Sequence, residues 1–293
     1  MPLRFGMLGC GYWARHLHLP GLAVHPGVTL VGVWGRRAEA AEEAGRAFGV
    51  PGFADLEALL AQVEAVAIAL PPDAQPARAV AAARHGCHLL LEKPLAFTTA
   101  DARAVAEAVE RAGVAQASFV TRRYVPELME EVSAIAADGP WERAHGHLHS
   151  GALLPGTPYT DCAWRIARGA LWDIGPHALS VLLPALGPVE AVLDCQEREH
   201  VTTLRLRHRG GVLSETTLSL HAAPDACGET YVFEAERRRR TLTVTLPPRP
   251  DSYARALSAL CAAVAGTAPR TSLDADIAMV RVLEAAEELR SRA

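Results

Sequence analysis

Residues 3–14 read LRFGMLGCGYWA, an apolar run that leads into the pattern G-x-G-x-x-A at Gly9, Gly11 and Ala14. Gly9 permits a tight turn, Gly11 lets the backbone approach a pyrophosphate, and Ala14 lets the next helix pack closely on the strand. The first free N–H groups of that helix, near Tyr12 and Trp13, would face the phosphates. A glycine-rich turn without a ligand is the alternative, since the motif alone is weak. Its place between a strand and a helix is the context that a dinucleotide site requires.

The rest of the first 121 residues alternates apolar runs with Ala-rich helical stretches. Parallel strands covered on both faces read as continuous apolar runs, and helical patterns of 10 to 15 residues between them indicate βαβ units. We expect strands at 3–8, 29–34, 65–69, 88–91 and 115–120. These runs predict a parallel sheet of the Rossmann type in residues 1–121.

The pattern changes in residues 122–293. Helical stretches at 126–137 and 169–186 are followed by consecutive strand patterns between 189 and 246, and helices at 251–265 and 273–290 close the chain. Consecutive strands with tight turns indicate an antiparallel sheet. We therefore predict an α/β protein: a dinucleotide-binding Rossmann domain, 1–121, followed by an α+β domain, 122–293, with an open, mostly antiparallel sheet for substrate binding and oligomerisation.

Composition narrows the possible partners. The formal net charge of −4 argues against nucleic acid and anionic membranes, which both need a basic surface. No apolar stretch reaches the length of a transmembrane helix, and the N-terminus shows no signal peptide. The six cysteines are scattered without CxxC or metal-ligand spacing, so we expect free thiols rather than disulfides, and a cytoplasmic location.

The end of the second expected strand bears on the choice of dinucleotide. A site for NAD(H) usually places Asp or Glu there, on the adenosine ribose hydroxyls. This chain has Gly35, Arg36 and Arg37 instead, and guanidinium groups can grip a 2′-phosphate bidentately. We predict that NADP(H) is preferred, with NAD(H) possible. The alternative is that both arginines are solvated residues at the start of a helix.

Two further features bear on chemistry. Lys93 is the only lysine in the chain, against 28 arginines, and it ends the apolar run LLLE in LLLEKPLAF. A lysine is a compact charge whose pKa can fall on desolvation, which suits a group that touches one substrate oxygen. Far along the chain, Asp173 and His177 are four residues apart, so in one helix they could hydrogen-bond, leaving the other imidazole nitrogen to exchange a proton. An N-cap aspartate beside a packed histidine is the alternative.

With these residues in place, the chain resembles the Gfo/Idh/MocA family of NAD(P)-dependent oxidoreductases over essentially its whole length. Its main signatures are Gly9-x-Gly11-x-x-Ala14, Glu92-Lys93-Pro94 and Asp173-Ile174-Gly175-Pro176-His177, and lesser ones are Pro71-Pro72, Arg123-Tyr124-x-Pro126 and Trp164-Arg165. Two positions depart from the family pattern. Ser180 stands where a second Asp often follows the histidine, and Gln75 stands where a His commonly follows the Pro-Pro loop.

The resemblance implies hydride transfer at a carbinol or carbonyl carbon of a sugar, polyol or related compound. It assigns Lys93 to the nicotinamide and the substrate oxygen, His177 to acid/base catalysis, and Asp173 to orienting the histidine or binding substrate, with Glu92 fixing its turn and a cis bond before Pro94. The cofactor contacts expected in total are Gly9, Gly11, Tyr12, Trp13, Ala14, Gly35, Arg36, Arg37, Leu70, Pro71, Pro72, Glu92 and Lys93. The substrate contacts expected are Tyr124, Trp164, Arg165, Asp173 and His177. A homodimer or homotetramer through the second sheet is also implied.

Other residues are given structural roles. His145, His147 and His149 alternate on one strand, but the sequence places no acid or Cys beside them, so we expect no metal. The run ERRRR at 236–240 is expected to be a solvated hairpin end. His16 and His18 are taken as structural. A dinucleotide-binding sensor or scaffold that has lost its chemistry is the alternative function, because fold does not fix function.

Overall fold

The computed structural model describes residues 1–292 and divides them into two units. Unit 1 contains Met1–Tyr124 and Pro247–Ile277, and unit 2 contains Val125–Leu246 and the residues from Ala278 onward. The sequence placed the boundary at residue 121 and assigned everything after it to the second domain. The structure corrects this, because residues 247–277 return to pack with the first unit.

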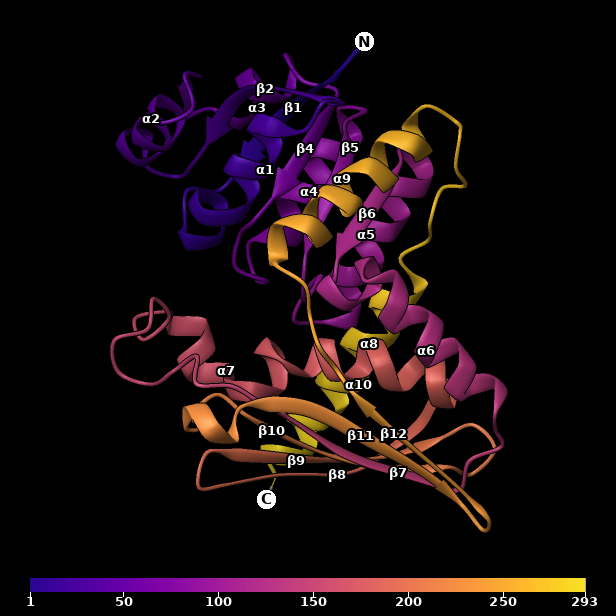
Figure 1. The fold of residues 1–293 in the computed structure, drawn as a ribbon. Coiled ribbons are helices and arrows are strands. Elements are labelled where there is room, and N and C mark those ends of the chain that lie inside the picture. Colours follow the sequence, from indigo (N-terminus) through magenta and orange to yellow (C-terminus); the bar gives the residue numbers. More distant parts are fainter. Residues whose placement is uncertain (293) are drawn as a thin grey trace. The chain divides into compact units, whose positions relative to one another are not determined.

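Unit 1 is built on a six-stranded parallel sheet in the order β3-β2-β1-β4-β5-β6, with helices around it (Figure 1). The strands are β1 (Leu3–Leu8), β2 (Val28–Trp34), β3 (Gly52–Phe53), β4 (Ala65–Ile68), β5 (His88–Glu92) and β6 (Gln116–Phe119). The helices are η1 (Ala14–His18), α1 (Leu19–Val24), α2 (Ala38–Arg46), α3 (Leu56–Leu60), α4 (Gln75–Arg84), α5 (Thr99–Ala112), η2 (Thr121–Tyr124) and α9 (Arg249–Val264). The predicted parallel sheet is confirmed, and the short strand β3 is an addition.

Helix α9 explains why the C-terminal segment belongs to unit 1. Its residues Tyr253, Leu257 and Leu260 are fully buried, and they share one core with Phe5 of β1 and Phe119 of β6. Burying a large apolar side chain contributes about 1.5–3 kcal/mol. Without α9, this side of the sheet would expose a continuous apolar surface.

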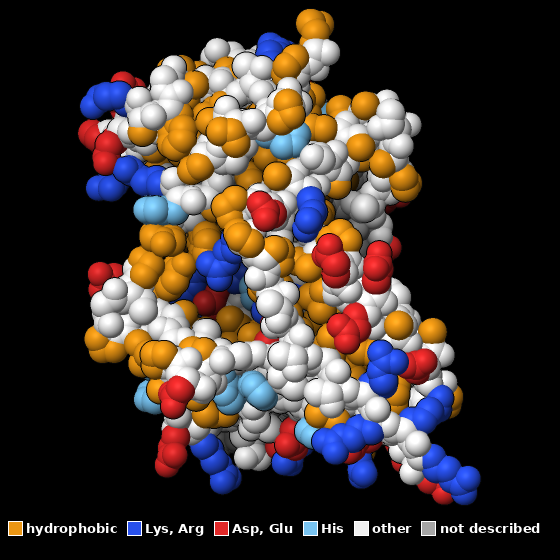
Figure 2. Space-filling view, viewed as in Figure 1, with side chains coloured by type: hydrophobic (Ala, Val, Ile, Leu, Met, Phe, Trp, Pro, Cys, Tyr) orange, Lys and Arg blue, Asp and Glu red, His pale blue; other side chains and the backbone are white. Residues whose placement is uncertain are grey.

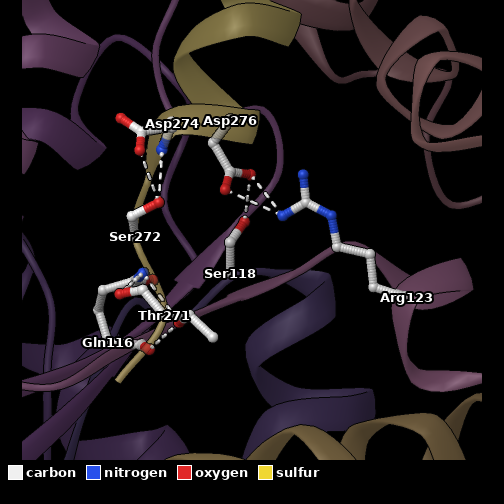
Figure 3. A network of polar contacts seen from close by, with 7 residues as sticks. All are labelled: Gln116, Ser118, Arg123, Thr271, Ser272, Asp274 and Asp276. Carbon is white, nitrogen blue, oxygen red and sulfur yellow. Dashed lines mark hydrogen bonds and ion pairs between the residues drawn. The ribbon is translucent and has the colours of Figure 1, made fainter. Parts of the chain in front are cut away.

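A polar network fastens the end of this segment to the sheet (Figure 3). The carboxylate of Asp276, at the start of α10 (Asp274–Arg290), accepts hydrogen bonds from Ser118 Oγ at 2.7 Å and from Arg123 Nη1 at 2.9 and 3.1 Å. Gln116 Nε2 donates to the carbonyl of Thr271 at 3.1 Å. Asp276 is 3% exposed, so an ion pair that is largely sheltered from water joins the end of β6 to the residues that follow α9.

Unit 2 has a six-stranded mixed sheet in the order β12-β11-β7-β10-β9-β8, in which β7 and β10 are parallel and the other neighbours antiparallel. The strands are β7 (Arg143–His149), β8 (Val189–Arg198), β9 (Val201–His208), β10 (Leu213–Ser219), β11 (Gly228–Ala235) and β12 (Arg238–Thr243). Its other elements are α6 (Pro126–Ala137), α7 (Ala163–Asp173), α8 (Gly175–Leu186), η3 (Pro224–Ala226) and the later part of α10. Helices α6, α7, α8 and α10 lie over one face of this sheet, as Figure 1 shows. The strand pairing confirms the expected open, mostly antiparallel sheet.

The helix expected within residues 169–186 is present as α8, but the same stretch also contains the end of an earlier helix, α7. Helix α7 begins earlier, at Ala163, and Gly169 interrupts it with φ 66° and ψ −158°. Helix α8 then begins at Gly175. Glycine can adopt this conformation because it has no Cβ, whereas residues with a Cβ rarely adopt it. The chain therefore turns twice between residues 163 and 177.

The arginine hairpin, residues 236–240, covers the turn after β11 and the first residues of β12, and it makes more contacts than the sequence suggested. Positive side chains gather over the tip of this hairpin in Figure 2. Arg238 donates to the carbonyls of Asp138 and Pro140 and lies 5.6 Å from the centre of the Trp141 ring. Arg240 pairs with the Asp138 carboxylate at 2.5 Å. Two of the arginines therefore hold the turn between α6 and β7.

Within residues 1–292, no helix is long and apolar enough to cross a membrane. All six cysteines are free thiols, as expected.

Candidate active site

The carboxyl ends of β1, β2 and β4 meet at one edge of the unit 1 sheet. Gly9 N–H donates to the Trp34 carbonyl, and Ala69 N–H donates to the Leu8 carbonyl, both at 2.9 Å. The strand order reverses direction between β1 and β4, which is where open parallel sheets bind their ligands. Three of the predicted cofactor segments, after β1, β2 and β4, therefore lie side by side.

The glycine loop, residues 9–14, has the shape that a dinucleotide needs. Gly9 has φ 124°, and a Cβ there would lie 2.4 Å from the Ala69 carbonyl oxygen. A Cβ on Gly11 would meet nothing within 4 Å, so the backbone at this point is open to a ligand. Ala14 is fully buried in the core, as close packing of helix on strand requires. Tyr12 is exposed and Trp13 half-buried. The loop therefore fits a pyrophosphate group.

Arg15 holds the backbone of this loop in place, a role that the sequence did not reveal. Its Nε donates to the Cys10 carbonyl at 3.0 Å, and its Nη1 pairs with Glu43 of α2 at 2.8 Å. Hydrogen bonding to Glu43 raises the pKa of Arg15, and hydrogen bonding to Arg15 lowers the pKa of Glu43. The ion pair joins the glycine loop to the helix that follows β2.

The residues after β2 are a tightly packed glycine followed by two exposed arginines. Gly35 packs so closely on Cys10 that a Cβ there would lie 2.6 Å from the sulfur. Arg36 and Arg37 are exposed at the start of α2. A third guanidinium, of Arg78, lies 5.8 Å from the centre of the Trp34 ring. Arg78 could not be predicted from the sequence, because α4 follows a different strand and only the fold brings Arg78 to the end of β2.

Strand β5 ends at Glu92, and the Lys93 turn, residues 92–95, follows it. The Lys93–Pro94 bond is cis, as the family resemblance implied. Gln75, the first residue of α4, hydrogen-bonds to the backbone of this turn, and His18 lies 2.8 Å from the Glu92 carboxylate. Leu70 and Pro71 follow β4 at the same edge, where Leu70 is half-buried and Pro71 is exposed, while Pro72 is buried.

In unit 2, Asp173 and His177 do not share one helix. Asp173 is the last residue of α7, and His177 lies in the first turn of α8, which Pro176 opens as expected. Asp173 is buried and pairs with Arg165, whose Nε lies 3.0 Å from Oδ2. The same-helix argument for these two residues is therefore wrong, because Ile174 ends one helix and caps the next.

Arg165 lies between two aromatic rings. The centre of its guanidinium is 4.6 Å from the Trp164 ring and 4.8 Å from the Tyr159 ring. Burial opposes the charge of Arg165, but attraction to Asp173 outweighs it, and the pKa is raised. Tyr159 was not predicted, because nothing in its loop sequence marks it. The result is a fixed, flat cation in unit 2 beside two predicted substrate residues.

The two departures from the family pattern, Ser180 and Gln75, are both buried side chains that donate to backbone carbonyls. Ser180 Oγ donates to the His177 carbonyl at 2.6 Å, so this side chain bonds to its own helix. Tyr124 belongs to unit 1, where it stacks on Phe119 at 6.1 Å, and burial raises its pKa to about 12. Among residues 1–292, no three His, Cys, Asp or Glu side chains are grouped as metal ligands.

Comparison with known proteins supports the family that the sequence motifs resemble. The family model described as "Oxidoreductase family, NAD-binding Rossmann fold" matches residues 3–119. The chain is 30% identical over 258 residues to dTDP-3,4-didehydro-2,6-dideoxy-alpha-D-glucose 3-reductase of Streptomyces antibioticus, covering 84% of this chain and 77% of that protein. It is 27% identical over 281 residues to D-apiose dehydrogenase of Paraburkholderia graminis, covering 85% and 73%.

Solved structures share the fold over nearly the whole chain. The WlbA dehydrogenase from Bordetella pertussis, in complex with NADH and UDP-GlcNAcA, superposes with a TM-score of 0.84 at 21% identity and covers 99% of this chain and 97% of its own. KijD10, a 3-ketoreductase from Actinomadura kijaniata in complex with TDP-benzene and NADP, gives 0.76 at 19% identity, with 99% and 98% covered. The chain therefore belongs to the Gfo/Idh/MocA family and is an NAD(P)-dependent oxidoreductase that acts on CH–OH groups.

Proposed function

We propose that this enzyme uses NADP(H) and transfers a hydride to or from a carbinol or carbonyl carbon of a sugar, polyol or related small molecule. The observation that carries the cofactor preference is the arrangement after β2, where Gly35 is packed against Cys10 and two exposed arginines follow it. No carboxylate occupies that position for a ribose hydroxyl. Guanidinium groups suit a 2′-phosphate, with Arg78 as a third candidate.

The cofactor preference is tested by binding titrations that follow NADPH and NADH fluorescence. A hydrogen bond to a charged group contributes about 1.5–3 kcal/mol, so Arg36→Ala with Arg37→Ala should weaken NADPH by about 10-fold or more. NADH should change by less than about threefold. Arg46→Ala is the matched control, because Arg46 is an exposed arginine of the same helix that pairs only loosely with Glu42, at 3.7 Å. Tighter binding of NADH than of NADPH by the natural protein would refute the preference.

The catalytic residues are proposed as Lys93, His177 and Asp173. The dinucleotide supplies or accepts the hydride when bound. Lys93, on the turn after β5, donates a hydrogen bond to the substrate oxygen and stabilises the negative charge that develops on it. His177 takes the hydroxyl proton in oxidation and returns one in reduction. Asp173 fixes Arg165 between Tyr159 and Trp164, and this held guanidinium contacts substrate oxygens.

The relatives suggest which substrates to test first. The Streptomyces relative is named for a dTDP-linked 3-keto sugar and the Paraburkholderia relative for a free pentose. We would assay NADP⁺ reduction and NADPH oxidation with nucleotide-linked hexoses, their keto forms, free pentoses and polyols. Lys93→Ala and His177→Ala should lower turnover by about 100-fold or more while NADPH binding persists. Near-normal turnover in both variants would contradict the assignment.

We also propose that two copies of the chain meet through the uncovered face of the unit 2 sheet. A shallow groove on this face is lined by His145, His147 and His149 of β7 and by Glu215 and Thr217 of β10. An arginine on a flat self-complementary face would oppose its own copy, so Thr217→Arg should shift the mass measured by light scattering toward the monomer. Glu131→Arg, on exposed α6, is the control. The free thiols agree with a cytoplasmic location, which we propose as well.

A further inference from the structure

We propose that Gln75 and His18 are positioning residues for Lys93: through Glu92 and the turn backbone they fix the main chain from which the lysine side chain projects. The inference rests on the proposed role of Lys93 in the reaction. It adds two residues that the sequence left without a function. His18 was taken as structural, and Gln75 as a departure from the family pattern.

Gln75 holds the backbone on both sides of Lys93. Its Oε1 accepts the Glu92 N–H at 3.0 Å, and its Nε2 lies 2.7 Å from the Glu92 carbonyl oxygen. The same Nε2 lies 3.2 Å from the carbonyl oxygens of Pro94 and Leu95. β5 ends at Glu92, so the carbonyls of Pro94 and Leu95 lie beyond the strand pairing. The uncharged amide of Gln75 accepts through its oxygen and donates through its nitrogen, and Gln75 is fully buried.

His18 reaches the Lys93 backbone through Glu92. The imidazole Nε2 is 2.8 Å from Glu92 Oε1, and the other oxygen, Oε2, accepts the Lys93 N–H at 3.1 Å. A carboxylate oxygen accepts and an imidazole N–H donates, so this hydrogen bond forms with the His18 tautomer that has its hydrogen on Nε2. Two successive hydrogen bonds therefore connect a side chain of η1 to the main chain of the lysine.

The surroundings make this connection rigid. The His18 ring is fully buried and lies 4.7 Å from the Tyr253 ring and 6.3 Å from the Phe119 ring, both edge-on. Tyr253 is also fully buried, and burial, with the nearby charge of Glu92, raises its pKa well above the usual value. A hydrogen bond is stronger in an environment that excludes water. Close packing also restricts rotation of the His18 ring.

The position of His18 in the chain connects the glycine loop to the Lys93 turn. It ends η1, which begins at Ala14, directly after the glycine loop. The segment that is shaped for the pyrophosphate and the turn that carries Lys93 are thus fixed to each other within unit 1. Gln75 makes the same kind of connection from the start of α4. The lysine is therefore held at a set place relative to the cofactor loop before any ligand arrives.

The single lysine makes a direct test possible. Trace acetic anhydride acylates unprotonated amines, and mass spectrometry would give the labelling rate of Lys93 relative to that of an added reference peptide with one lysine, between pH 7 and pH 11. The readout needs no substrate. His18→Leu, which removes the donor to Glu92, and Gln75→Glu, which keeps the shape but loses the amide donors, should each change the relative rate or its pH midpoint, the rate by about fivefold or more.

Two variants keep the test specific. His18→Gln carries an amide nitrogen near the position of Nε2 and should stay within twofold of the natural protein. His16→Leu changes an exposed histidine of the same helical segment, which contacts the Tyr12 carbonyl and the Tyr12 ring, and should also stay within twofold. If His18→Leu does not fold, as judged by circular dichroism, His18→Asn replaces it, because its shorter side chain stops short of Glu92.

The outcomes separate this inference from the proposed function. Unchanged Lys93 labelling in both His18→Leu and Gln75→Glu would overturn the positioning role, and so would a His18→Gln variant as altered as His18→Leu. Neither result would affect the role of Lys93 in turnover. Conversely, a Lys93→Ala enzyme with full activity would remove the catalytic role but leave the labelling result standing.

Discussion

Replacing Gly35 with aspartate should not by itself convert the site to NAD(H). The acid that binds ribose hydroxyls in many dinucleotide sites would stand at this position, but Gly35 packs against the sulfur of Cys10. We expect Gly35→Asp to weaken NADPH by about 100-fold, because a carboxylate would face the 2′-phosphate, and to leave NADH within about threefold of its starting affinity. Only Cys10→Ala with Gly35→Asp should gain NADH affinity.

The magnitude follows from the contacts. A Cβ at Gly35 would lie 2.6 Å from Cys10 Sγ, whereas its next neighbours, Ala41 Cβ and the Arg37 carbonyl oxygen, are at 3.5 and 3.6 Å and need not move. The thiol must therefore rotate away from the Trp34 carbonyl, 3.7 Å from it. An unfavourable rotamer and a lost weak hydrogen bond together cost about 1–2 kcal/mol. Removing the sulfur should return that amount, a gain of about 5- to 30-fold for NADH over Gly35→Asp alone.

The assay is a double-mutant cycle in cofactor affinity, with NADPH and NADH titrated against all four proteins. Cys10→Ala alone should bind NADPH within threefold of the natural protein, and its melting temperature reports whether the loop survives. If Gly35→Asp alone binds NADH tenfold more tightly and Cys10→Ala adds nothing, then the contact between these residues does not limit the choice of cofactor.

Three other predictions concern stability. Asp276→Ala should destabilise unit 1 by about 3 kcal/mol in urea denaturation, because it removes the buried acceptor shared by a serine and an arginine, whereas Asp274→Ala, exposed in the same turn, should cost less than about 1 kcal/mol; equal effects would be evidence against the network. Gly169→Ala should destabilise unit 2 by about 1–3 kcal/mol, seen as a lower melting temperature, since its backbone conformation strains any residue with a Cβ; an unchanged melting temperature would contradict this. Burial lowers the pKa of His208, so the unfolded chain takes up this proton at a higher pH than the folded chain and unit 2 loses stability as the pH falls below about 6.5. His208→Asn, which can still donate to the Gly187 carbonyl, should reduce the pH dependence of stability between pH 6.5 and 5, and an identical pH profile would refute the assignment.

Local patterns in the sequence were sufficient for the features that depend on a few neighbouring residues. Gly9 and Ala14 were predicted correctly because a tight turn and a close helix contact each restrict one residue type. Lys93 was placed at the end of a buried strand because LLLE is an unbroken apolar run up to its last residue. The parallel sheet followed from the same kind of run repeated at βαβ spacing.

Features that depend on distant residues were not predictable in this way. Helix α9 reads as an ordinary amphipathic helix, and nothing in its pattern says that its apolar face covers a sheet made more than a hundred residues earlier. Gln75 and His18 are single polar residues, and their connection to the Lys93 turn appears only when α4, η1 and β5 lie together. The prediction for Asp173 and His177 failed for the opposite reason. A spacing of four residues suits one helix, but Ile174 separates two helices.

The return of residues 247–277 to unit 1 has a consequence for synthesis on the ribosome. Most of unit 2 is an insertion between β6 and α9, so unit 1 cannot complete its core until about 140 further residues have been made. At 5–20 residues per second this delay lasts roughly 7–28 s. Throughout that time the surface that Tyr253, Leu257 and Leu260 later cover remains open to water. Unit 1 is therefore completed only after most of unit 2 has been made, and its nascent sheet is the part that chaperones would need to protect.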